Sequence, residues 1–124
     1  MQPKNFKDKI AVELDTSCEY MKEAINSIKS YPKWSNRFRV MSEDRYEHAE
    51  QLYKMFMELY IDTKDQDAYM NSIRDAIVEL FATKTRLIDG YRATYDLVVD
   101  SSESLEEETE HERDITKPGD DQTV

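Results

Sequence analysis

Residues 38–60 read FRVMSEDRYEHAEQLYKMFMELY, and this stretch decides the expected fold. One set of residues recurs at alternating spacings of three and four, a pattern called a seam below, by which a helix faces its neighbours in a bundle. The seam consists of Phe38, Met41, Arg45, His48, Leu52, Met55 and Leu59. A second stripe beside it consists of Tyr46, Ala49, Tyr53, Phe56 and Tyr60. So wide an apolar face needs cover on two sides, so we expect this helix at the centre of the fold.

Seams with the same spacing lie before and after this stretch. The first consists of Ile10, Leu14, Cys18, Met21, Ile25 and Ile28, and the last of Met70, Ile73, Ile77, Leu80, Lys84, Leu87, Tyr91, Thr94 and Val98. They predict helices over about 9–29, 36–60 and 67–100. Pro32 is expected in the connection between the first two helices, and Gly90 marks a place where the last helix could break. Only two glycines and three prolines occur in 124 residues, which favours an all-α fold. Short connections make consecutive helices antiparallel, so we expect an elongated antiparallel three-helix bundle over residues 9–100.

The two ends of the chain differ from this body. Residues 1–8 are polar and are expected to be a flexible N-terminus. The net charge of −10 is concentrated at the other end, because residues 101–124 hold 9 acidic and 2 basic side chains, against 18 and 15 in residues 1–100. We therefore predict a disordered acidic tail over 101–124. A nearly balanced body with an acidic tail disfavours binding to nucleic acid or to an anionic membrane surface.

The single cysteine, Cys18, cannot form an internal disulfide. The N-terminus lacks the pattern of a signal peptide, and no apolar run is long enough to cross a bilayer. We therefore expect a protein that is neither secreted nor embedded in a membrane.

Polar residues interrupt the seams at similar levels. Folding the helices back on their two turns places Cys18 beside His48, and Met21 beside Arg45 and Lys84. The expected polar core layer consists of Glu19, Glu23, Arg45, His48 and Lys84. Its main interpretation is structural, because charged residues on a seam fix the register of helices that could otherwise slide.

Two chemical alternatives involve the same layer. Iron or zinc could be bound by His48, Glu19 and Asp44, with Cys18 nearby, although the two permanent cations would occupy the same space. A pair of Cys18 and His48 has the residue types of a nucleophile and its base, but a cysteine on a seam is usually a small buried hydrophobe. We therefore predict no catalytic residues, no cofactor and no small-molecule substrate.

The last predicted helix is longer than the other two and should project beyond them. The projecting end carries the apolar residues Tyr91, Tyr95, Leu97, Val98 and Val99. An uncovered apolar strip usually marks an interface. The leading prediction is therefore a non-enzymatic interaction module that associates with itself, with another structural protein, or with both. A further alternative is an acidic inhibitor that acts through residues 101–124.

Residues 38–52 resemble the second helix of ferritin-like and rubrerythrin-like proteins, in which a phenylalanine opens the helix and a Glu-x-x-His pair binds iron. Phe38 and His48 fit that pattern, but Arg45 stands three residues before His48 where the carboxylate is required. The resemblance therefore implies the fold without the iron chemistry, unless oligomerisation completes a metal site.

Residues 13–98 as a whole are similar to small ferritin-like helical proteins encoded among the structural genes of tailed bacteriophages. The matching residues are Tyr20, Ala24, Pro32, Ser42, Asp44, His48, Leu52, Met70, Asp75 and Tyr95. This resemblance implies an incomplete ferritin-like bundle with a role in the virion or its assembly, located in the virion or the host cytoplasm.

Overall fold

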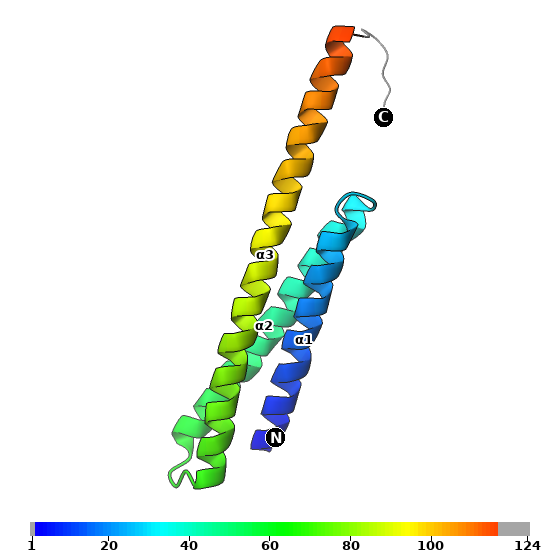
Figure 1. Cartoon of the computed structure of the whole chain (residues 1–124). Coiled ribbons are helices and arrows are strands. Elements are labelled where there is room, and N and C mark those ends of the chain that lie inside the picture. The colour runs from blue at the N-terminus through cyan, green and yellow to red at the C-terminus, as the bar shows by residue number, and fades with distance from the viewer. Residues whose placement is uncertain (1, 117–124) are drawn as a thin grey trace.

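The chain forms three helices in a computed structural model that describes residues 2–116, with side chains described for residues 2–101. They are α1 (Pro3–Ser27), α2 (Pro32–Asp62) and α3 (Ala68–Thr116), and the described residues contain no strand (Figure 1). Consecutive helices are antiparallel, and the assembly is elongated (Figure 1). The predicted all-α three-helix bundle is thus confirmed.

α3 is the longest helix and extends well past the turn that joins α1 to α2 (Figure 1). Its 49 residues correspond to about 73 Å at 1.5 Å per residue, against about 37 Å for the 25 residues of α1. It runs unbroken through Gly90 and ends at Thr116 rather than near Asp100. Residues 101–116 contain no proline or glycine and are rich in glutamate, a good helix former, whereas Pro118 and Gly119 follow. The rest of the predicted tail, 117–124, lies outside the described residues.

The first two helices, α1 and α2, begin earlier in the sequence than expected. α1 starts at Pro3 rather than near residue 9, and α2 starts at Pro32 rather than near residue 36. Proline suits the first helical position, because its ring presets φ and the N–H that it lacks would have no partner there. Phe6, predicted in a flexible segment, is buried and meets Phe56 edge-on with ring centroids 5.8 Å apart. This contact anchors the first turns of α1 to the end of α2.

α1 and α2 pack closely through small residues at intervals of seven. The buried residues of α2 are Ser35, Ser42, Ala49 and Phe56. Three of these four side chains are small, so the α1 backbone can approach α2 along this line. α1 and α2 accordingly share the most extensive contact of the three helix pairs.

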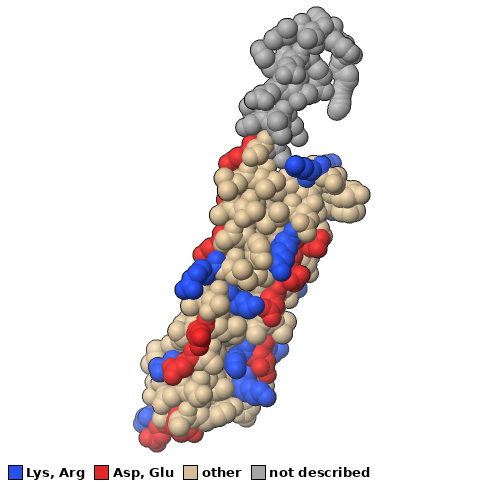
Figure 2. Space-filling view, in the orientation of Figure 1, with Lys and Arg blue, Asp and Glu red and all other residues tan. Residues whose placement is uncertain are grey.

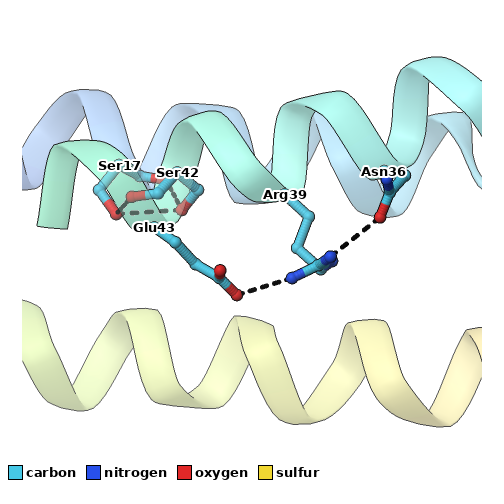
Figure 3. Close-up of polar contacts among 5 residues, drawn as sticks. All are labelled: Ser17, Asn36, Arg39, Ser42 and Glu43. Atoms are coloured by element: carbon cyan, nitrogen blue, oxygen red, sulfur yellow. Dashed lines mark hydrogen bonds and ion pairs between the residues drawn. The ribbon is translucent and has the colours of Figure 1, made fainter. Parts of the chain in front are cut away.

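A pair of serines forms the centre of this contact (Figure 3). Ser17 donates a hydrogen bond from Oγ to the Ser42 carbonyl oxygen at 2.8 Å, and Ser42 donates from Oγ to the Ser17 carbonyl oxygen at 2.7 Å. Each hydroxyl has one proton and uses it in these bonds, so the 3.0 Å separation of the two Oγ atoms is a consequence of their packing. Both serines are fully buried and both are satisfied.

α2 and α3 are kept apart by aromatic side chains. Their backbones approach each other at few positions, and the space is bridged by Tyr46, Tyr53 and Tyr60, again at intervals of seven. The Phe81 ring lies 5.7 Å from the Tyr46 ring and 4.7 Å from the Tyr53 ring, measured between centroids. Tyr46 also shares a hydrogen bond of 2.9 Å with Thr85. The α2–α3 contact is therefore made by long side chains rather than by close backbones.

These two kinds of packing make α1, not α2, the central helix. α1 contacts both other helices and, with Ile28 just beyond its end, supplies most of the buried apolar side chains: Phe6, Ile10, Leu14, Cys18, Met21, Ala24 and Ile28. The predicted central position of residues 36–60 is therefore wrong. The seam from Phe38 to Leu59 is only partly buried, and Met55 is 50% exposed. The physical reason is that α1 approaches α2 along its small residues, which leaves the large ones at the side of the contact.

Candidate functional site

Arg45 and His48, at the middle of the α2 seam, share one partner on α1. Arg45 Nη1 lies 3.3 Å from Glu13 Oε1, and His48 Nδ1 lies 3.5 Å from Glu13 Oε2. The Glu13 side chain is 19% exposed, whereas that of His48 is 54% exposed. The structure thus brings Arg45 and His48 together, but at the surface of the α1–α2 contact and around an acid that was not predicted.

The other members of the predicted polar layer lie elsewhere. Lys84 Nζ is 2.9 Å from Asp15 Oδ1, and this hydrogen bond raises the pKa of Lys84. Glu19 pairs with Lys22 at 3.5 Å on the exposed face of α1, and the charge of Glu19 raises the pKa of Lys22. Glu23 is exposed. The five residues therefore do not form one buried layer; the buried polar pair of the core is Ser17 with Ser42.

The difference arises from register. The predicted alignment placed Cys18 of α1 beside His48 of α2. In the structure, hydrogen bonds join Ser17 to Ser42, and Glu13 forms ion pairs with Arg45 and His48. α1 is therefore displaced along α2 by about seven residues, one repeat of the seam. The cause is the turn, because Pro32 begins α2 instead of lying in the connection. A shift by a full repeat preserves the seam pattern, so periodicity alone does not reveal Glu13 as the partner.

The alternative metal ligands are not gathered in one place. Glu19 pairs with Lys22 and His48 with Glu13. Among the residues with described side chains, no group of three or more His, Cys, Asp or Glu is arranged to hold a metal ion. Iron or zinc binding by His48, Glu19 and Asp44 thus stays an untested prediction.

Cys18 lies in the hydrophobic core with Ile10, Leu14 and Ile77. Its burial raises the pKa of the thiol. A raised pKa disfavours the thiolate, which is the nucleophilic form, so this environment is that of a structural cysteine. His48, its supposed base, is engaged with Glu13 instead.

The predicted interface residues on α3 divide into two groups. Tyr91 lies under Lys22, with Nζ 5.6 Å from the ring centroid, and Tyr95 lines a small cleft of about 210 Å³ between α3 and the other helices. Val98 and Val99 are half-buried. Leu97 is 69% exposed and is the member that is most clearly uncovered.

A further surface on α3 was missed by the sequence reasoning. Its residues, called the α3 outer seam below, are Thr83, Leu87, Gly90, Thr94 and Leu97, all exposed and spaced alternately by four and three. A shallow groove of about 540 Å³ follows part of this line. Apart from its two chain neighbours and the nearby backbone of its own helix, no atom lies within 4 Å of the place where a Cβ on Gly90 would sit. Leu87 and Thr94 had been predicted to lie in the seam that faces the other helices, and this placement is wrong because both are exposed; Leu97 had been grouped with Tyr95 and Val98 instead.

A second groove runs between α1 and α2 on the surface that carries Arg45 and His48. It has a volume of about 630 Å³ and is lined by Asp8, Lys9, Val12, Glu13, His48, Gln51, Leu52 and Met55. Val12 is 61% exposed although it is a large aliphatic residue. This groove is where the apolar part of the predicted α2 seam meets solvent.

On the face seen in Figure 2, the charged side chains do not form a patch of one sign. Lysine and arginine are interspersed with aspartate and glutamate along the bundle. Within the described part of the chain, no helix combines the length and apolarity that a membrane crossing requires.

No family model, curated protein or solved structure matches the chain. The resemblance to ferritin-like phage proteins therefore has no support beyond the residues that carry it. The two uncovered helix surfaces are the features from which a function can be argued.

Proposed function

We propose that this protein is a non-enzymatic helical interaction module that binds a helix of another protein along the α3 outer seam. The observation that carries the proposal is an exposed, uncharged line of residues at coiled-coil spacing, on a helix that extends past its own bundle (Figure 1). Such spacing is the requirement for knobs-into-holes packing against a second helix. Leu87 and Leu97 would supply the large side chains of the contact.

The small residues of this surface suit a close helix partner. Gly90 stands between Leu87 and Thr94 in the seam and has open space above it. Within this protein, Ser17 and Ser42 allow α1 and α2 to approach in the same way. Burial of a fully exposed leucine contributes roughly 1.5–3 kcal/mol, and covering Leu87 and Leu97, which are 43% and 69% exposed, contributes a corresponding part of it for each.

Charge disfavours a second copy of α3 as the partner. An antiparallel pair of α3 helices that matched Leu87 with Gly90 would place Glu79 near Asp100 of the other copy. Both residues are exposed, and like charges at such positions are destabilising. A helix from a different protein is therefore the expected occupant. The virion context implied by the resemblance stays a prediction.

The test is position-specific photo-crosslinking in the source cell. A photo-reactive amino acid is placed at Leu97 and, as the matched control, at Ala82, which is also exposed on α3 but off the outer seam. We expect one adduct of defined mass from position 97 that is absent from position 82, and that disappears in the Leu87→Glu background. Equal labelling at both positions, or labelling unaffected by Leu87→Glu, would refute the proposal.

A further inference from the structure

We propose that the exposed face shared by α1 and α2 is covered by the same face of a second copy, in an antiparallel two-fold dimer whose axis passes Val12 and His48, so that the groove at one end of this face lies against the half that carries Met41 in the other copy. This inference concerns a different surface from the α3 outer seam and does not depend on the proposed function. In the dimer, α1 would lie on α1 of the partner and α2 on α2, which completes a four-helix bundle. The two α3 helices would then lie on opposite outer sides and project in opposite directions.

The first argument is the symmetry of the α2 seam. A two-fold interface uses the same surface on both subunits, so that surface must complement itself. Met41 and Met55 stand seven residues before and seven residues after His48, and both are at least 40% exposed. Phe38 and Leu59 stand ten before and eleven after it. An antiparallel pair centred on His48 therefore sets Met41 on Met55 and Phe38 on Leu59, while Arg45 meets Leu52 at the levels beside the centre.

The second argument is that both helices share one centre. Glu13 pairs with His48, and Val12, its neighbour in the chain, lines the same groove as His48. A two-fold axis that crosses α2 at His48 thus also crosses α1 at Val12. Val12 is the most exposed aliphatic residue of α1, and at this position it would meet its own copy.

The third argument is charge complementarity along α1. Before Val12, residues 4–9 carry Lys4, Lys7 and Lys9 against Asp8, a net charge of +2. After it, residues 13–23 carry four acids and Lys22; Glu13 pairs within the chain with Arg45 and His48, Asp15 with Lys84 and Glu19 with Lys22, which leaves a net charge of −1 from Glu23. An antiparallel pair centred on Val12 places the basic half opposite the acidic half, whereas a parallel pair would place like charges together.

α2 is polarised about its own centre as well. Residues 33–45 carry Lys33, Arg37, Arg39 and Arg45 against Glu43 and Asp44, a net charge of +2. Residues 50–62 carry Lys54 against Glu50, Glu58 and Asp62, a net charge of −2. Arg39 and Glu43 are paired with each other at 2.8 Å, and omitting both leaves the balance unchanged (Figure 3). Both helices therefore favour the same antiparallel orientation.

The size of the surface is adequate for a dimer. The seam from Phe38 to Leu59 spans 21 residue steps, or about 32 Å, and two adjacent helices present a face roughly 20 Å wide. The projected face is on the order of 600 Å² per copy, near the roughly 800 Å² of accessible surface that a standard interface buries on each side.

The dimer would also give the Arg45, His48 and Glu13 cluster a role. Each copy brings one such cluster to the axis, where the two polar groups would lie between apolar levels. Polar residues in that setting fix the register of a bundle. Two members of the polar layer expected within one chain, Arg45 and His48, would then lie in a polar layer between two chains.

The experiment is the mass of the full chain by sedimentation and light scattering, with charge variants of the two methionines. We expect twice the chain mass of 14.7 kDa for the native protein. Met41→Lys and Met55→Glu should each weaken the dimer roughly 100-fold without loss of helicity, because each change occurs twice in the interface. The double variant should restore it, since the two new charges are opposite in sign and face each other across the axis.

Crosslinking fixes the orientation. Val12→Cys should form a disulfide between copies, whereas Met41→Cys should not, because Met41 faces Met55 of the other copy. Leu97→Glu is the matched control that should leave the dimer intact, which separates this interface from the α3 outer seam. Three results would each overturn the proposal. They are a native protein that is monomeric at about 100 µM, a dimer whose dissociation constant is unchanged by Met41→Lys, and a disulfide between copies formed by Met41→Cys.

Discussion

The buried serine pair allows a quantitative test of how α1 and α2 are held together. Ser17 and Ser42 each donate to a backbone carbonyl of the other helix. Replacing one by alanine removes one hydrogen bond, but the remaining hydroxyl keeps its own acceptor, because that acceptor is backbone. A buried hydrogen bond contributes about 1 kcal/mol net, and alanine regains roughly 0.5 kcal/mol of helix propensity over serine.

We therefore expect Ser17→Ala and Ser42→Ala each to lower the free energy of unfolding by about 0.5–1 kcal/mol, and the double variant by about the sum. The measurement is urea unfolding followed by circular dichroism at 222 nm. Ser72→Ala, at an exposed position of α3, is the control for the propensity gain. A coupling energy above about 1 kcal/mol would refute the reasoning, since it would mean that the contact between the two Oγ atoms carries the energy.

Three further predictions concern other parts of the bundle. Phe56→Ala should cost about 3–5 kcal/mol in chemical unfolding because Phe56 is fully buried, whereas Met55→Ala, half exposed, should cost less than about 1.5 kcal/mol; similar costs would contradict the observed face of α2. Gly90→Ala should raise the melting temperature and add about 0.5–1 kcal/mol to the free energy of unfolding, because the new Cβ lies in open space on a helix. A lower melting temperature would contradict this and would indicate that another helix already packs closely on Gly90 in the purified protein. The pKa values of Cys18 and Lys84 are both raised in the folded state, so their stabilising contribution is complete below the unfolded values of about 8.5 and 10.4 and is lost as pH rises through the folded values. Unfolding free energy measured from pH 7 to 11 should therefore fall above about pH 9, and Cys18→Ala should remove the first part of that fall; a rise over this range would contradict the direction of both shifts.

The candidate surfaces were only partly predictable. Leu97 was expected to be exposed because α3 is longer than its neighbours, and it is. Tyr91 and Tyr95 were grouped with it, but Lys22 covers one and a cleft beside α1 and α2 holds the other. A sequence shows that a helix projects, but which residues its neighbours reach depends on where those neighbours end.

The three helices follow from local features of the sequence. Helix periodicity, the scarcity of glycine and the short turns are local properties, and they predicted three antiparallel helices with the last one longest. Packing between the helices establishes which helix is central, which face of α2 is buried and which acid meets Arg45 and His48. The physical reason is that a seam repeats every seven residues, so it looks the same after a shift of one repeat. The turn that ends at Pro32 and the close fit of small residues, Ser17 against Ser42, together select one register among these equivalents.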